Sequence, residues 1–240
     1  MSAVAIIPAR GGSKRLPRKN VLPFRGKPML AWTIEAALAS GRFTKIIVST
    51  DDEEAAAVAS QYWVSVDKRP AHLATDEARV VDVCVDILKR HSYAIAACLY
   101  ATAPLRTAKD IQETMTLLSH TGPSFALAAT DYAMSPHQAL KLVPQLESRR
   151  EFHGDCQVTS IYQTGELAEP MWPDLIEKRH DEMPKFVVDN GSTYCCFVEP
   201  FMQQRTFYGK TLAVHVMPRE RSVDIDTKAD LDYALWLASK

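Results

Sequence analysis

The chain opens with Ala3-Val4-Ala5-Ile6-Ile7-Pro8-Ala9-Arg10-Gly11-Gly12-Ser13-Lys14, and this stretch decides the fold. Residues 3–7 form an uninterrupted apolar run that ends at Pro8. Such a run is typical of a parallel strand that is buried on both faces. The glycine pair and the basic residues that follow therefore lie at the carboxyl end of a buried strand, where ligands bind in sheets of this kind.

Strand and helix patterns alternate along most of the chain. Apolar spacing predicts helices at 29–39 (with Gly41 as its stop), at 52–61, at 80–91, from Thr107 onward and at 228–239. Short apolar runs predict further strands at 45–50, 64–66, 95–100 and 125–129. This alternation predicts an α/β fold, with a single Rossmann-like domain over residues 1–240, a mostly parallel sheet and helices on both faces.

Residues 134–184 depart from this alternation. They combine several prolines and dense charges with weak periodicity, and Pro170-Met171-Trp172-Pro173 lies within them. We interpret this segment as an inserted excursion that serves as a substrate lid or as a dimerisation contact.

Composition narrows the possible partners. The net charge of −1 creates no broad field toward nucleic acid or a membrane surface. No apolar run approaches the ~20 residues that a bilayer span needs, and the N-terminus lacks the layout of a signal peptide. The five cysteines form no CxxC pair and no Cys/His ligand spacing. We therefore expect reduced thiols, no zinc site and a cytoplasmic protein.

The loop after the first strand carries a concentrated positive charge. Five cationic side chains fall within residues 10–19, and two glycines allow backbone N–H groups to form an anion nest. A triphosphate requires this combination, because several negative charges must be neutralised before phosphoryl transfer. The loop matches neither GxxxxGK[ST] nor GxGxxG. An exposed basic turn is the alternative, but its place after a buried strand and the stiffening by Pro17 and Pro23 favour a binding loop.

A pair of carboxylates lies near the C-terminus, in Ser222-Val223-Asp224-Ile225-Asp226-Thr227. At i and i+2, Asp224 and Asp226 point to the same side of an extended segment and can share one Mg²⁺ ion. Alternatively, Asp226 caps the helix that begins near Lys228. The two residues alone leave both interpretations open.

The motifs resemble, in the same order, those of the acylneuraminate cytidylyltransferases, which act on nonulosonic acids. The resemblance rests on Ile7–Lys14 with Lys19-Asn20, Gly26–Met29, Val48–Asp51, Arg69-Pro70, Leu73–Asp76, Thr102–Arg106, Asn190-Gly191 with Tyr194, and Val223–Thr227 with Asp230-Leu231. These motifs span nearly the whole chain and leave mainly residues 134–184 without a counterpart.

This resemblance implies a nucleotidyltransferase that transfers CMP from CTP to the anomeric hydroxyl of a nine-carbon 2-keto acid sugar and releases pyrophosphate. The residues expected to bind the nucleotide are Ala9, Arg10, Gly11, Ser13, Lys14, Asn20, Arg69, Ala74, Thr75 and Asp76. The expected catalytic residues are Arg10, Lys14, Lys19 and Asp224. Asp224 and Asp226 are expected to hold Mg²⁺ as the cofactor.

The sugar side of the resemblance is mixed. Tyr100, Thr102, Asn190 and Gly191 are the residues expected to bind the sugar. Tyr100-Ala101-Thr102 resembles the pseudaminic acid branch, whereas Asn190-Gly191 resembles the sialic and legionaminic acid members. We therefore rank pseudaminic acid first, legionaminic acid or an isomer of it second and sialic acid third.

The motifs disfavour two other functions for this chain. A related enzyme acting on the eight-carbon acid of lipopolysaccharide is disfavoured by the neuraminate-like basic loop. A nucleotide-binding protein without catalysis is disfavoured by Lys19, Asp224 and Asp226, which it would not need. The resemblance further implies a homodimer that serves surface glycan biosynthesis, in which residues 134–184 reach the partner's active site.

Overall fold

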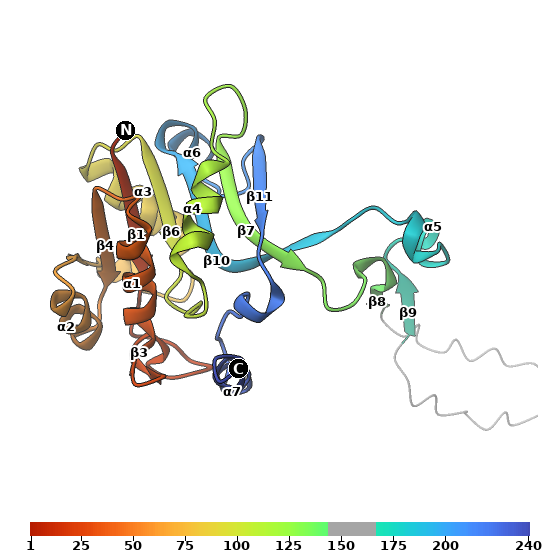
Figure 1. The fold of residues 1–240 in the computed structure, drawn as a ribbon, viewed down its shortest axis with the longest axis horizontal. Coiled ribbons are helices and arrows are strands. Elements are labelled where there is room, and N and C mark those ends of the chain that lie inside the picture. The colour runs from red at the N-terminus through yellow and green to blue at the C-terminus, as the bar shows by residue number, and fades with distance from the viewer. Residues whose placement is uncertain (144–166) are drawn as a thin grey trace, which may run out of the picture. The chain divides into compact units, whose positions relative to one another are not determined.

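The computed structural model describes residues 1–143 and 167–240. Its main feature is a seven-stranded sheet with the strand order β11-β7-β10-β6-β1-β4-β5 (Figure 1). The strands are β1 (Ala3–Pro8), β4 (Lys45–Thr50), β5 (Ser65–Lys68), β6 (Ile95–Leu99), β7 (Phe125–Asp131), β10 (Val187–Phe197) and β11 (Leu212–Val216). Neighbouring strands pair in parallel except β10, which runs antiparallel to β6 and β7. The predicted α/β class with a mostly parallel sheet is confirmed.

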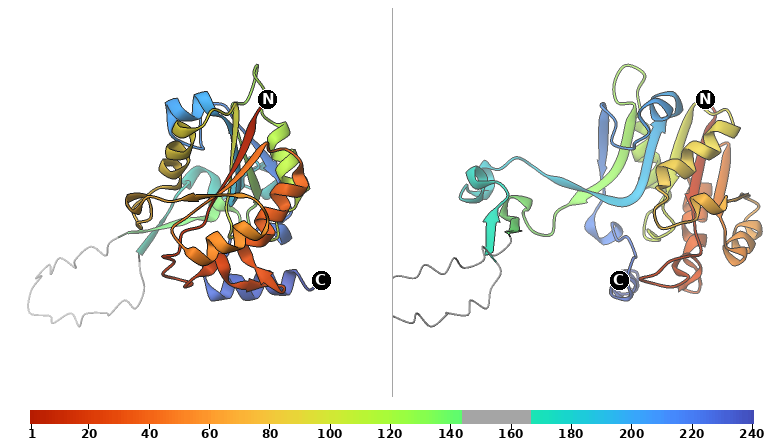
Figure 2. Two further views of the ribbon diagram at one scale, coloured as in Figure 1. Left: turned by 90° about the vertical axis from the view of Figure 1, so that its left-hand side faces the viewer. Right: turned by 180° about the vertical axis from the view of Figure 1, so that it is seen from behind.

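Helices cover both faces of this sheet, as the edge-on view in Figure 2 shows. They are α1 (Met29–Ser40), α2 (Glu53–Gln61), α3 (Val80–Arg90), α4 (Ala108–Thr116) and α6 (Val198–Gln204), with α7 (Lys228–Leu237) near the C-terminus. Ala5 and Ile7 of β1 belong to the apolar cluster that includes α1 and α2. Val4 and Ile6 belong to the cluster that includes α3 and α6. The strand is therefore buried on both faces, as its apolar run predicts.

Shorter elements complete the described chain. Two antiparallel pairs occur, β2 (Pro23–Phe24) with β3 (Lys27–Pro28) and β8 (Leu140–Val143) with β9 (Leu167–Pro170). Single 3₁₀ turns occupy Lys19–Val21, Ala71–Leu73, Pro136–Gln138, His180–Glu182 and Arg219–Arg221.

The described chain divides into two compact units. The sheet unit consists of residues 1–131 and 187–240 and contains the seven-stranded sheet. The second unit consists of residues 132–186 and contains β8, β9 and α5 (Pro173–Ile176). The sequence places an inserted excursion at 134–184, of which 144–166 lies outside the described residues. The role of this segment as a lid or dimer contact stays a prediction.

Local sequence signals account for several helix boundaries. Gly41, the predicted stop of α1, adopts the left-handed conformation with φ of 62°. Thr107 caps α4 and forms a capping box with Asp110. Helix α7 is capped by Thr227, which forms the equivalent box with Asp230. The alternative in which Asp226 caps this helix is therefore wrong.

Residues 187–227 contain elements that periodicity does not predict, namely β10, α6 and β11. The polar run 189–192 interrupts β10, and the register of β10 against β7 shifts between Asp189 and Tyr194. Because a bulge adds residues to one strand only, it destroys the period-2 pattern by which strands are recognised.

Two features of the described residues concern membrane-spanning helices and disulfide bonds. No helix among them is long and apolar enough to cross a membrane. Their four cysteines, Cys84, Cys98, Cys195 and Cys196, are buried and form no disulfide. Cys156 lies outside the described residues.

A buried carboxylate ties α4 to the segment that leads to Asp224. Arg221 donates to Asp110 through Nε at 3.1 Å and through Nη2 at 2.7 Å. The hydroxyl of Thr107 donates to the same carboxylate at 2.6 Å. Burial alone would raise the pKa of Asp110, but the hydrogen bonds from Arg221 and Thr107 outweigh it and hold the pKa at about 2.

Replacing Arg221 with Met should lower the free energy of unfolding by roughly 2–3 kcal/mol at neutral pH, because Asp110 stays charged and buried without its main partner. The folded pKa of Asp110 lies below its unfolded value of about 3.9. Its stabilisation is therefore complete above about pH 4 and is lost as the pH falls toward 2. Urea unfolding should show that the difference in free energy of unfolding between wild type and variant decreases as the pH falls over that range. Equal stability at neutral pH would contradict the role of this ion pair.

Candidate functional site

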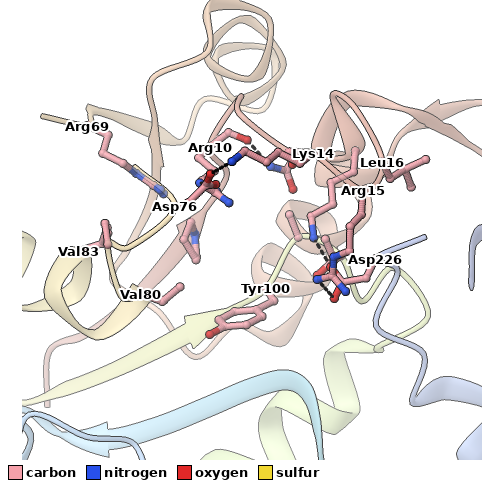
Figure 3. Close-up of a pocket in the computed structure, with 17 residues that line it drawn as sticks. Arg10, Lys14, Arg15, Leu16, Arg69, Asp76, Val80, Val83, Tyr100 and Asp226 are labelled. Carbon is pink, nitrogen blue, oxygen red and sulfur yellow. Dashed lines mark hydrogen bonds and ion pairs between the residues drawn. The ribbon is translucent and has the colours of Figure 1, made fainter. Parts of the chain in front are cut away.

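A pocket of about 440 Å³ opens at the carboxyl ends of β1, β5 and β6 in the sheet unit (Figure 3). It is lined by Pro8, Arg10, Ser13, Lys14, Arg15, Leu16, Lys19, Asn20, Arg69, Asp76, Ala78, Val80, Val83, Tyr100, Ala101, Thr102 and Asp226. Five of these side chains are cations and two are carboxylates. The excess of positive charge makes the pocket suited to a ligand with several negative charges.

The loop after β1 is held against the end of β4. The N–H of Ala9 donates to the carbonyl of Ser49 at 2.9 Å, and the N–H of Gly11 donates to Oδ1 of Asp51 at 2.9 Å. The N–H of Ser13 donates to the carbonyl of Gly11. Two N–H groups of the predicted anion nest are therefore engaged within the protein, and the cationic side chains rather than these amides face the pocket.

Two carboxylates each pair with two cations of this loop and so offset half of the positive charge of those four side chains. The carboxylate of Asp76 forms ion pairs with Nη1 of Arg10 at 2.7 Å and with Nζ of Lys14 at 2.5 Å. The carboxylate of Asp226 forms ion pairs with Nη2 of Arg15 at 2.6 Å and with Nζ of Lys19 at 2.5 Å (Figure 3). Burial opposes ionisation of Asp226, but Lys19 and Arg15 hold its pKa below the ordinary value. Both carboxylates are therefore charged and compete with any anion for the four cations.

Arg69 and Asn20 form part of the pocket wall. Arg69 is buried and donates through Nη2 to the carbonyl of Ser49 at 2.8 Å. Burial lowers the pKa of Arg69, and Asp51 partly offsets this effect. Asn20 donates through Nδ2 to the carbonyl of Arg10 at 2.9 Å, so that it shapes the loop from which Arg10 projects.

The opposite wall comes from the loop after β6. Tyr100 and Thr102 line the pocket, and burial raises the pKa of the Tyr100 hydroxyl, which therefore stays protonated. The Tyr100 ring packs 5.4 Å from the ring of Tyr194. The carbonyl of Thr102 accepts the N–H of Ile225 at 2.8 Å, which joins this wall to the carboxylate segment 224–226.

Asp224 lies behind the pocket wall in an unusual environment. Its Oδ1 is buried without a hydrogen-bond partner, and burial raises its pKa. Its carboxylate packs so closely on Gly191 that a Cβ there would lie 2.8 Å from Oδ2. Gly191 has φ of 68°, which favours glycine. An orphaned buried carboxylate oxygen requires an explanation, and a cation would supply one.

The described residues contain no cluster of three or more His, Cys, Asp or Glu side chains that could hold a metal ion. Asp224 and Asp226 are the carboxylates that would hold Mg²⁺, which proteins commonly bind through one or two carboxylates together with phosphate oxygens and water. The charge of Asp226 and the unpartnered oxygen of Asp224 both match this ligand type.

The predicted site residues separate into two groups. The pocket is lined by Arg10, Ser13, Lys14, Lys19, Asn20, Arg69, Asp76, Tyr100, Thr102 and Asp226. It is not lined by Ala9, Gly11, Ala74, Thr75, Asn190, Gly191 or Asp224. The carbonyl of Thr75 accepts from Nη1 of Arg10 at 3.1 Å.

Asn190, which the sequence predicts to bind the sugar, does not line the pocket, and its predicted role stays a prediction. It is buried, its Nδ2 donates to Ser222 at 3.1 Å, and its Oδ1 accepts from Ser192 at 3.1 Å. It therefore braces the bulge of β10 against the segment before Asp224.

Arg15 is the main pocket residue that the sequence did not single out. It belongs to the recognised basic loop, but only the fold places it opposite Asp226. The apolar lining residues Val80 and Val83 come from α3, whose predicted apolar stripe indicates core rather than pocket.

The model of the cytidylyltransferase family matches residues 4–149 of this chain. This chain belongs to the cytidylyltransferase family. The resemblance read from the motifs is therefore confirmed, and with it the enzyme class of a CTP-dependent nucleotidyltransferase.

Curated relatives extend this similarity over nearly the whole chain. Pseudaminic acid cytidylyltransferase from Campylobacter jejuni is 32% identical over 240 residues, covering 98% of this chain and 95% of the relative. CMP-N,N'-diacetyllegionaminic acid synthase from Legionella pneumophila is 33% identical over 237 residues, covering 96% and 93%. N-acylneuraminate cytidylyltransferase from Escherichia coli is 30% identical over 238 residues, covering 99% of this chain and 52% of the relative.

One solved structure supports the fold in addition. CMP:2-keto-3-deoxy-manno-octonic acid synthetase complexed with CTP superposes with a TM-score of 0.68, covering 100% of this chain and 99% of that one. At 20% sequence identity this similarity shows the shared fold alone.

Replacing Gly191 with Ala should reduce transferase activity at least roughly tenfold, because the new Cβ forces the Asp224 carboxylate to move. Gly41→Ala is the matched control. Its φ of 62° imposes a similar backbone cost of about 1 kcal/mol, yet a Cβ there meets nothing within 4 Å. Thermal unfolding should show a loss of stability in both variants, larger for Gly191→Ala, whereas only Gly191→Ala loses activity. Equal activity in the two variants would contradict the close contact between Gly191 and Asp224.

Proposed function

We propose that this cytidylyltransferase transfers CMP from CTP to the anomeric hydroxyl of a nonulosonic acid, with pseudaminic acid as the favoured acceptor, and releases pyrophosphate. The observation that carries the proposal is the cationic loop 10–19, which faces a pocket at the carboxyl end of the parallel strands. The curated relatives named for pseudaminic, legionaminic and acylneuraminic acids support the acceptor class.

The nucleotide's phosphates would lie across the basic loop. Arg10, Lys14, Arg15 and Lys19 are held by Asp76 and Asp226 in the protein without nucleotide. A triphosphate would take over these cations, so that charge pairs within the protein are exchanged for pairs with the ligand. Arg69 would contribute to the cytidine end of the same pocket.

The exchange has a consequence for the cofactor. Asp226 is paired with Lys19 and Arg15. If phosphates took over these two cations, Asp226 and Asp224 would be the residues that hold Mg²⁺. Bound there, Mg²⁺ would neutralise phosphate charge and polarise the phosphorus that is attacked. The chain's own cations would then orient the triphosphate for in-line attack, without a covalent enzyme intermediate.

The acceptor would enter beside Tyr100 and Thr102. These two residues line the pocket, whereas Asn190 is occupied with Ser222 and Ser192. The motif that lines the pocket is thus the one that resembles the pseudaminic acid branch, and this supports pseudaminic acid over legionaminic and sialic acids. A homodimer in the cytoplasm, with the second unit serving the partner's site, completes the proposal.

Pyrophosphate release should be measured with CTP and Mg²⁺ and, in separate assays, pseudaminic, legionaminic and sialic acids. We expect the highest kcat/KM with pseudaminic acid, because Tyr100 and Thr102 line the pocket and lie in the motif that resembles the pseudaminic acid branch. Preference for legionaminic or sialic acid would overturn the choice of sugar and leave the reaction type intact. Tight CTP binding without turnover of any acid sugar would instead favour a nucleotide-binding protein without this activity.

Replacing Asp224 with Asn should lower kcat by roughly a hundredfold or more, because one of two carboxylates that hold the metal loses its charge. Asp232→Asn, an exposed change on α7, is the control and should leave kcat unchanged. Both variants should unfold within a few degrees of wild type. Near-normal activity of Asp224→Asn at saturating Mg²⁺ would refute the metal assignment.

A further inference from the structure

Asp189 lies at the start of the bulge in β10 and accepts three hydrogen bonds there. Its Oδ1 accepts the N–H of Gly191 at 2.9 Å. Its Oδ2 accepts the hydroxyl of Tyr194 at 2.8 Å and also the hydroxyl of Tyr208. Asp189 is half-buried and does not line the pocket. A carboxylate is suited to this position because it accepts several bonds at once and strengthens each by its charge.

The contact through Oδ1 leads to the carboxylate that is proposed to hold the metal. Gly191 adopts its positive φ in the short turn that Asp189 closes, and this turn places the Gly191 Cα against Asp224. A change in the turn would therefore shift the surface on which the Asp224 carboxylate rests.

The contact through Oδ2 leads to the acceptor wall, which is the part of the pocket lined by Tyr100 and Thr102. The hydroxyl of Tyr194 is held by Asp189, while its ring packs between Tyr100 at 5.4 Å and Phe207 at 4.9 Å. The Tyr194 side chain is buried, and Tyr100 is the member of this stack that faces the pocket. The position of the Tyr100 ring therefore depends on the Tyr194 ring behind it.

We propose that Asp189 is a positioning residue that aligns the Asp224 carboxylate with the Tyr100 acceptor wall through its two oxygens. The proposal rests on the proposed function and adds to it a residue that touches neither nucleotide nor acceptor. One side chain would thus set both the metal ligand and the surface that presents the attacking hydroxyl. If Asp189 had a purely structural role, replacing it would change only the stability of the protein.

Tyr208 offers the cleanest probe of this arrangement. Its side chain is 60% exposed, so that Tyr208→Phe removes one hydrogen bond to Asp189 with little change in core packing. Tyr233→Phe is the matched control, because Tyr233 is 48% exposed on α7 and its ring stacks on Trp236. Asp189→Ala removes all three hydrogen bonds, whereas Asp189→Asn keeps one oxygen for Gly191 and an amide that the tyrosine hydroxyls can accept from.

The four variants and wild type should be compared in three measurements. These are the acceptor KM and kcat from pyrophosphate release, the affinity for Mn²⁺ in the presence of CTP by electron paramagnetic resonance, and the thermal unfolding midpoint. We expect Tyr208→Phe to raise the acceptor KM roughly threefold to tenfold, as the loss of a charge-assisted hydrogen bond predicts, with unchanged Mn²⁺ affinity. Asp189→Ala should raise the acceptor KM and weaken Mn²⁺ binding, each at least roughly tenfold. Asp189→Asn should recover most of both losses, and Tyr233→Phe should match wild type.

The outcomes separate this inference from the proposed function. If wild type turns over an acid sugar while Asp189→Ala and Tyr208→Phe change only the unfolding midpoint, Asp189 is structural and the inference is wrong. If wild type shows no turnover but Asp189→Ala still weakens Mn²⁺ binding and Asp189→Asn restores it, the positioning of Asp224 is supported and the acceptor assignment fails. Failure of wild type to bind CTP would overturn both.

Discussion

The ion pairs of Asp226 with Lys19 and Arg15 are the contact on which the rest of the site depends. They join residues from opposite ends of the chain, at positions 15–19 and 226, across the carboxyl edge of the sheet. The buried strand β1 delivers the first group, and the segment held by Arg221 and Asp110 delivers the second. Because each partner is anchored to a different layer, the pocket forms only when the whole sheet unit is folded.

Two carboxylates offset part of the positive charge of the pocket. Asp76 and Asp226 each hold two cations, which keeps a strongly basic loop from repelling itself in the folded protein. A ligand with several negative charges would compete with both carboxylates for these cations. Under the proposed function, the carboxylate that the phosphates release is also one that would hold the metal.

The bulge in β10 gives the second half of the site its shape. The Asp224 carboxylate rests on Gly191 within this bulge, so closely that a Cβ on Gly191 would lie 2.8 Å from its Oδ2. The bulge brings Asp189, Asn190 and Gly191 into a compact turn in which each has a separate task. Asp189 accepts hydrogen bonds from Tyr194 and Tyr208, and Asn190 donates one to Ser222. Gly191, which has no Cβ, allows the Asp224 carboxylate to pack against its Cα.

The sequence by itself determined the α/β class, most helix and strand positions before residue 130, and the cationic loop, because these depend on local periodicity and on residues adjacent in the chain. It also determined the family, from motifs that occur in order. Only the tertiary structure decided that Arg15 meets Asp226, that Asn190 donates to Ser222, and that β10 carries a bulge. These features depend on contacts between residues far apart in the chain, and no local pattern encodes the distance between them.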